Sequence, residues 1–171
     1  MNNEAFDYRS AINAERWADV VRHAETDLQF NPASGELWHA LAIALRAQKL
    51  DCVSAWENCA LYLPELPSVQ VSLGQTYVAS GRFAEAVCCY DAALRLDPNS
   101  TVARFGLANA LHARGELGAA ITHYCAALSL RPDMGEALSG LIEALRDHTK
   151  LSQNTFAHIT NRPHKYRWHS V

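Results

Sequence analysis

Residues 67–98 read PSVQVSLGQTYVASGRFAEAVCCYDAALRLDP, and this stretch decides the fold. Apolar and small side chains recur at intervals of three and four, first over residues 67–80 and again over residues 83–96, with Gly81 between them. This spacing predicts two amphipathic helices joined by a tight turn. Pro98 ends the second helix, because proline cannot continue one. The stretch therefore predicts a helical hairpin.

The same pattern returns along the chain with a nearly constant period. Prolines end successive copies at positions 32, 64, 98 and 132, so the spacings are 32, 34 and 34 residues. Counted back from these prolines, two positions keep their character: Val20, Cys52, Ala86 and Ala120 share the first, and Trp56, Tyr90 and Tyr124 share the second. A period near 34 is typical of stacked helical hairpins, each too thin to bury its apolar face alone. The sequence thus predicts an all-α solenoid.

These residues resemble the tetratricopeptide repeat (TPR) family. The family's pattern of Leu-Gly, Tyr, Ala, an aromatic residue, Ala and Pro is met by Leu73, Gly74, Tyr77, Ala86, Tyr90, Ala93 and Pro98. The resemblance covers roughly residues 14–148. It implies an all-α, TPR-type helical-hairpin solenoid of about four repeats with a capping helix and an irregular C-terminal tail. We expect the solenoid domain to span residues 1–160 and a basic, aromatic tail to span residues 161–171.

Three parts of the chain depart from the family's pattern. The unit that ends at Pro64 is two residues short, and we expect the deletion in the turn near residues 48–50, because loops tolerate deletions better than helices do. Residues 5–13 match the first-helix pattern poorly. At the other end, Leu151, Phe156 and Ile159 predict a final capping helix without the repeat signature.

Composition and charge exclude several classes of protein. The chain has 171 residues, 49% of them hydrophobic, which suits one domain with a sizeable core. A net charge of −3 argues against a general affinity for nucleic acid or for acidic membranes. There is no secretory signal and no apolar run long enough to cross a bilayer. The five cysteines lack the C-x-x-C spacing, so free thiols and a cytoplasmic location are expected.

No reactive constellation stands out, and we predict that the chain is not an enzyme and needs no cofactor or metal. Cys52 and Cys59 occupy positions that alanine fills in other copies, so they are interpreted as core residues. The remaining cysteines, Cys88, Cys89 and Cys125, have no predictable base nearby. The histidines have no paired metal-ligand spacing. A transition-metal site formed by His158, His164 and His169 is an alternative to surface histidines, the preferred interpretation.

The TPR resemblance implies a concave groove, lined by the first helix of each hairpin, in which peptides or partner helices bind. Carried over by repeat position, the groove residues are His39, Ile43, Arg46, Ser72, Gln75, Phe105, Asn109, His112, Glu143 and Arg146, with Glu36, Ser68, Val71, Val102, Glu136 and Ser139 beside them. Asn109 is the most suggestive, because an amide can pair bidentately with an extended peptide backbone. A solvated helix face is the alternative for each of them. One family subset clamps a terminal carboxylate with basic residues, and that clamp is missing here.

The leading hypothesis is a non-enzymatic protein–protein interaction module, an adaptor, chaperone or assembly factor that holds a partner polypeptide in the groove. One alternative is a regulatory TPR portion of, or partner to, an enzyme such as a glycosyltransferase. Another is contact with nucleic acid or an acidic surface through residues 163–169, PHKYRWH, where cations alternate with aromatic side chains. The same segment can instead dock in a groove, its own or a neighbour's, so self-association is also considered. No membrane partner is expected.

Overall fold

The computed structural model describes residues 6–160, and within that range the side chains of residues 154–160 are excepted. The described residues form helices and turns and contain no strand. The helices, in chain order, are α1 (Tyr8–Asn13), α2 (Trp17–Phe30), α3 (Gly35–Ala47), α4 (Val53–Tyr62), α5 (Pro67–Ala79), α6 (Phe83–Leu96), α7 (Thr101–Ala113), α8 (Leu117–Leu130) and α9 (Gly135–Thr160). The expected tail, residues 161–171, lies outside the described residues.

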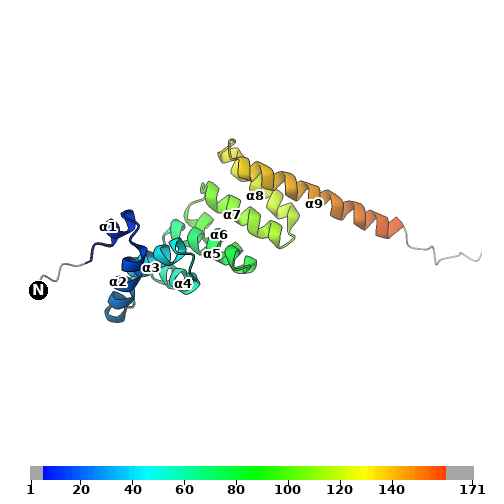
Figure 1. Ribbon diagram of the computed structural model, residues 1–171. Helices are drawn as coiled ribbons and strands as arrows, with labels where there is room; N and C mark the ends of the chain where they lie inside the picture. Colours follow the sequence, from blue (N-terminus) through cyan, green and yellow to red (C-terminus); the bar gives the residue numbers. More distant parts are fainter. Residues whose placement is uncertain (1–5, 161–171) are drawn as a thin grey trace, which may run out of the picture.

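Each helix packs against the next one along the chain, which gives four hairpins, α1/α2, α3/α4, α5/α6 and α7/α8, followed by α9. Figure 1 shows the hairpins stacked in chain order from α1 to α9. The first helices also touch each other, since α5 contacts α7 and α7 contacts α9, whereas successive second helices make no comparable contact in the described part of the chain. First helices therefore form the inner layer of the stack and second helices the outer layer. The predicted all-α hairpin solenoid is confirmed.

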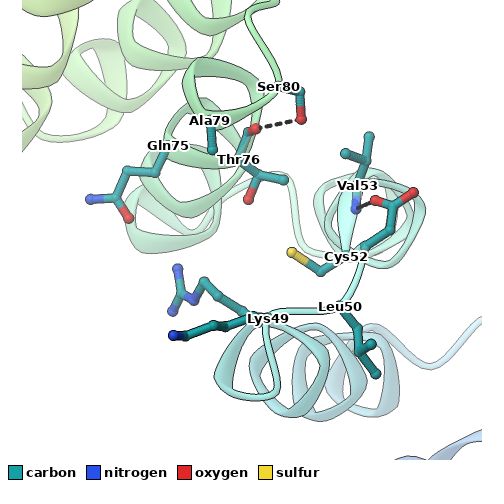
Figure 2. A pocket seen from close by; sticks show the side chains of 10 residues that line it. Lys49, Leu50, Cys52, Val53, Gln75, Thr76, Ala79 and Ser80 are labelled. Atoms are coloured by element: carbon teal, nitrogen blue, oxygen red, sulfur yellow. Dashed lines mark hydrogen bonds between the residues drawn. The ribbon is translucent and has the colours of Figure 1, made fainter.

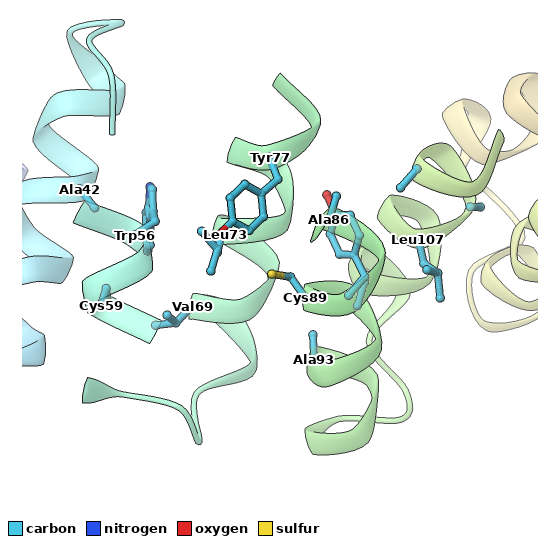
Figure 3. Close-up of a cluster of buried hydrophobic side chains, with 14 of the residues drawn as sticks. Ala42, Trp56, Cys59, Val69, Leu73, Tyr77, Ala86, Cys89, Ala93 and Leu107 are labelled. Carbon is cyan, nitrogen blue, oxygen red and sulfur yellow. The ribbon is translucent and has the colours of Figure 1, made fainter. Parts of the chain in front are cut away.

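A buried aromatic residue in each of the second helices α4, α6 and α8 joins its hairpin to the next unit. Trp56, Tyr90 and Tyr124 are 1%, 2% and 1% exposed. A Cβ placed on Gly106 of the following hairpin would lie 2.4 Å from the Tyr90 ring, so only glycine leaves room for it. Gly140 of α9 stands in the same relation to Tyr124, at 2.7 Å. The continuous core that results is seen in Figure 3 between Trp56 and Leu107.

The turns inside the hairpins share one backbone conformation. Gly81 and Gly115 have φ values of +72° and +80°, in the left-handed region that glycine enters without steric cost. In the first two hairpins the same place is taken by Glu15 and Lys49, with φ values of +54° and +59°. Every described hairpin thus turns through one left-handed residue, whether or not that residue is glycine.

The two residues that the short repeat lacks fall between the end of α3 and the start of α4, near the expected residues 48–50, but it is the helix that is shortened there and not the turn. Helix α3 has 13 residues, as α5 has, but α4 has 10 residues where α6 has 14. The turn of residues 48–52 is longer than that of residues 80–82. Asp51 starts α4 late, because its Oδ1 accepts a hydrogen bond from the Val53 backbone N–H at 3.0 Å. The contacts of one helical turn are thereby missing between α4 and its neighbours.

The two ends of the array differ from its middle. Helix α1 has only 6 residues, in agreement with the poor match of residues 5–13 to the repeat. The expected final helix is present, but it is continuous with the first helix of the last unit, so that α9 runs for 26 residues. Because the described residues include no second helix after α9, Leu138, Ile142 and Leu145 are about half exposed there.

Candidate functional site

The inner layer contains two cavities formed by successive first helices. The first, which we call the α5 cavity, has a volume of about 530 Å³ and is lined by Arg46, Pro67, Ser68, Val71, Ser72, Gln75, Asp97, Ser100 and Val102. The second, the α9 cavity, has a volume of about 570 Å³ and is lined by Asn109, His112, Ala113, Tyr124, Glu136, Ser139, Gly140 and Glu143. Together these cavities are the inner-face groove.

The structure divides the predicted groove residues into three groups. Arg46, Ser72 and Gln75 line the α5 cavity, and Asn109, His112 and Glu143 line the α9 cavity. The remaining four, His39, Ile43, Phe105 and Arg146, line neither. A role in binding stays a prediction for all ten.

The residues that line neither cavity have different surroundings. The His39 ring meets the edge of the Trp56 ring with 5.5 Å between centroids, and Ile43 and Phe105 are partly buried against the core. The Phe105 and Tyr124 rings lie 6.1 Å apart. Arg146 is exposed on α9. The side chains of His39, Ile43 and Phe105 therefore contact the core, whereas that of Arg146 is exposed to solvent.

Six of the residues that line the two cavities were not expected there from the sequence: Pro67, Asp97, Ser100, Ala113, Tyr124 and Gly140. Asp97 and Ser100 lie in the turn before α7, and Ser100 caps α7 by accepting from the Ala103 N–H. Tyr124 belongs to a second helix, so a rule that assigns the groove to first helices overlooks it. Its hydroxyl nevertheless reaches the groove because the neighbouring position on α9 is Gly140.

Asn109 is already engaged inside the protein. The Tyr124 hydroxyl donates to Asn109 Oδ1 at 2.6 Å. Burial, followed by the charge of Glu143, raises the pKa of Tyr124 to about 12, so the hydroxyl keeps its proton and remains a donor. This bond occupies one of the two lone pairs of Oδ1, so bidentate pairing of Asn109 with a partner backbone would need the second lone pair together with the amide N–H₂.

The two ends of the groove differ in charge, because the α5 cavity is lined by one cation, Arg46, and one carboxylate, Asp97, and the α9 cavity by two carboxylates. At the α5 cavity, the Arg46 guanidinium lies 5.1 Å from the centroid of the Trp56 ring, in a cation–π arrangement. Burial and then this guanidinium lower the pKa of His39. At the α9 cavity, Glu136 and Glu143 present carboxylates, and His112 pairs with Asp147 at 3.3 Å. A partner segment therefore meets both signs of charge at the α5 cavity and mainly carboxylates at the α9 cavity.

The thiols and the metal-ligating side chains do not build a reactive site in the described region. Cys52, Cys59 and Cys89 are buried, which confirms the first two as core residues. Burial raises the pKa of the Cys59 and Cys89 thiols to about 11 each, which disfavours the reactive thiolate. Among residues 6–153 no three His, Cys, Asp or Glu side chains gather as metal ligands. His158, His164 and His169 fall outside the described side chains.

A third cavity lies away from the inner face, at the turn of the second hairpin. It has a volume of about 270 Å³ and is lined by residues of α3, the turn of residues 48–52, the start of α4 and the last turns of α5. We call it the turn pocket, and Figure 2 shows it. Arg46 and Gln75 line both this pocket and the α5 cavity.

In the region that the structure covers, no helix combines the length and the apolar character needed to cross a membrane. Residues 71–136 match the family model of the tetratricopeptide repeat. No curated protein matches the sequence.

Solved structures of other TPR proteins share the fold. MamA AMB-1 is 23% identical with a TM-score of 0.74, over 86% of this chain and 91% of that one. YrrB is 16% identical with a TM-score of 0.72, over 77% and 69%. The first TPR domain of human RPAP3 is 18% identical with a TM-score of 0.65, over 71% and 98%. Residues 71–136 thus match the tetratricopeptide repeat, and the described chain shares the fold of solved TPR structures.

Proposed function

We propose that this protein is a non-enzymatic interaction module that holds a partner polypeptide along its inner-face groove. The observation that carries the proposal is the pair of cavities, each above 500 Å³, that the first helices build side by side. The TPR fold is in general a protein–protein interaction module. Adaptor, chaperone and assembly factor are forms of this role that differ only in the partner.

The neighbouring structures support a peptide as the partner. YrrB is described as a TPR protein with an unusual peptide-binding site, and 77% of the present chain superimposes on it. At 16% identity the similarity shows a common fold and not a common function. The argument for peptide binding by the present chain therefore depends on the cavities of this chain. Their width suits an extended segment or one helix, both of which TPR-like grooves can accept.

The charges of the groove suggest the direction in which a segment lies. Arg46 favours an acidic residue at the α5 cavity and Asp97 a basic one, whereas Glu136 and Glu143 both favour a basic residue at the α9 cavity. Such complementarity sets the register and orientation of a partner more than its affinity. We therefore expect a segment whose basic part lies over α9 and whose acidic residues lie beside Arg46.

Affinity purification followed by mass spectrometry identifies candidate partners, and variants of exposed groove residues then test where they bind. Gln75→Arg and Glu143→Lys each change one exposed side chain of the groove. Gln29→Arg and Glu25→Lys make the same changes on exposed positions of α2, outside both cavities. These positions are preferable to Phe105 and Asn109, whose side chains also serve the core.

With a purified partner, we expect each groove variant to raise Kd about tenfold, which corresponds to about 1.4 kcal/mol. The α2 controls should leave Kd unchanged, and circular dichroism should show equal helix content for all four. Equal affinity of the groove variants and the wild type would place the partner elsewhere and overturn the proposal.

A further inference from the structure

The turn pocket lies where the second hairpin lacks the first turn of its second helix. Arg46 and Lys49 border it from the end of α3, Cys52 from the start of α4, and Thr76 and Ala79 from α5. In Figure 2 the Cys52 thiol and the Thr76 side chain point into the space between these elements. The pocket is thus a space between two hairpins, at the end of the junction and not on the inner face.

The other hairpins show what normally fills this space. Their second helices begin with a large apolar residue, Trp17, Phe83 or Leu117, fifteen residues before the repeat's proline. Trp17 and Phe83 are half-buried and Leu117 is buried, and Trp17 packs against a cluster that includes Ala40 and Ala44 of the next hairpin. In the second hairpin the same count reaches Lys49, which is exposed. The pocket is the place of a missing apolar side chain.

The junction beside the pocket is also the loosest in the array. Helices α4 and α5 contact each other less than α2 and α3, α6 and α7, or α8 and α9 do. The direct contact between first helices that joins α5 to α7 is not matched between α3 and α5. No neighbouring hairpin can therefore close over the pocket in the way that the other junctions are closed.

The rim of the pocket is positively charged. Neither Arg46 nor Lys49 has a carboxylate within ion-pair distance in the described chain. The Trp56 ring holds the Arg46 guanidinium from one side. Asp51 also lines the pocket, and its Oδ1 accepts the Val53 N–H. Two cations against one carboxylate leave the lining with an excess of positive charge for an anion that approaches from solvent.

We propose that the turn pocket binds a large apolar side chain, aromatic or leucine, of a partner peptide, and that Arg46 and Lys49 bind carboxylates beside it. This inference rests on the proposed function, because Arg46 and Gln75 connect the pocket to the α5 cavity and one peptide can occupy both. The volume fits, since a dry cavity of about 150 Å³ holds benzene and the pocket has about 270 Å³. The peptide is thus acidic, with one bulky anchor.

A minimal probe of this chemistry is N-acetyltryptophan, which joins an indole to a carboxylate. We expect it to shift the backbone amide signals of Leu50, Cys52, Ala79 and Ser80 in the full-length chain, saturably, with a Kd of about 1 mM. N-acetyltryptophan amide lacks the charge and should bind about threefold more weakly, and acetate should not bind. Saturable shifts centred on other residues, or none at all, would overturn the proposal.

Two pairs of variants separate the pocket from nonspecific binding. Ala79→Trp fills the pocket from its exposed wall and should weaken the probe at least about tenfold. Its control, Ala47→Trp, changes the same repeat position of α3, also exposed but lining none of the three cavities, and should leave Kd unchanged. Lys49→Glu should weaken the binding of N-acetyltryptophan but not that of N-acetyltryptophan amide. Arg95→Glu on α6 is its control and should change the binding of neither compound. Full binding by Ala79→Trp, or equal losses in the controls, would contradict the pocket.

The partner identified for the groove then distinguishes the two proposals. If Glu143→Lys weakens the partner and Ala79→Trp does not, the groove stands and the turn pocket is wrong as a part of the peptide site. If neither variant weakens the partner, the proposed function fails as well. Loss of affinity in both variants, with the α2 and Ala47→Trp controls unchanged, supports both.

Discussion

The second hairpin, α3 with α4, and the third, α5 with α6, agree in the core and differ at the turn. Trp56 and Tyr90 hold the same repeat position, and both are almost fully buried. At the turn, Lys49 takes the left-handed conformation that Gly81 takes in the third hairpin, and α4 begins later than α6. The core positions thus maintain the stacking, while the start of a second helix can be lost. What replaces it is a cavity that the chain itself does not fill.

Removal of the buried aromatic residue should be the most damaging change in both hairpins. We expect Trp56→Ala and Tyr90→Ala each to lower the free energy of unfolding by about 3–5 kcal/mol, because each leaves a large cavity. In a stack with nearest-neighbour contacts, the loss also weakens the adjoining hairpins. Urea denaturation followed by circular dichroism measures both effects. A loss below about 1 kcal/mol for Trp56→Ala alone would mean that the two hairpins are not packed alike.

The junction that follows each aromatic residue can be tested by adding one methyl group. Gly106→Ala places a Cβ against the buried Tyr90 ring, and we expect a loss of about 1–2 kcal/mol after the gain in helix propensity. Ser72 holds the position after Trp56 that Gly106 holds after Tyr90, and it already carries a Cβ. We therefore expect Ser72→Ala to change the free energy of unfolding by no more than about 0.5 kcal/mol. Thermal and urea unfolding measure the difference.

Gly118→Ala is the control for Gly106→Ala, since a Cβ on Gly118 of α8 meets open space. This change should leave stability unchanged or raise it by up to about 1 kcal/mol. If Gly106→Ala behaved in the same way, Tyr90 would not be fixed against α7.

The features that repeat along the chain were predictable from the sequence. The buried aromatic residues, the left-handed Gly81 and Gly115, and the hairpin order all follow from side chains that return at a fixed spacing. Each depends on a residue type and its periodicity, which one sequence displays in several copies. Each copy of the repeat therefore supported the interpretation of the same position in the other copies.

Features that occur once were not predictable in the same way. The length of the second repeat shows that two residues are missing, but the division between turn and helix depends on the hydrogen bond of Asp51 to the Val53 N–H. The bond from Tyr124 to Asn109 joins side chains that only the fold brings together. Asp97 and Ser100 reach the α5 cavity because the loop before α7 passes beside α5, which periodicity does not record.

The left-handed turn residue provides a smaller test of the same comparison. Gly81→Ala forces a Cβ into a conformation with φ of +72°, and we expect a loss of about 1 kcal/mol. Lys49→Gly relieves the corresponding cost in the second hairpin and should leave stability unchanged or raise it by up to about 1 kcal/mol. Opposite signs in urea unfolding would show that both turns have the same backbone. A destabilising Lys49→Gly would mean that the Lys49 side chain itself stabilises the turn.

The smallest expected effect concerns the charge that distinguishes α3 from α5. Arg46 lies over the Trp56 ring, whereas α5 has Val78 at the corresponding position. Burial and then the Arg46 charge lower the pKa of His39, so in acid the unfolded chain binds more protons than the folded one. Stability should therefore fall as the pH drops through the ordinary histidine pKa of about 6.5.

Arg46→Met removes the charge and keeps an apolar contact with Trp56, so the pKa of His39 should rise toward that value in an NMR titration. Arg95→Met on α6 is the control and should leave it unchanged. An unaltered His39 pKa in Arg46→Met would mean that the guanidinium does not lie over Trp56, and the positively charged rim of the turn pocket would then rest on Lys49 alone.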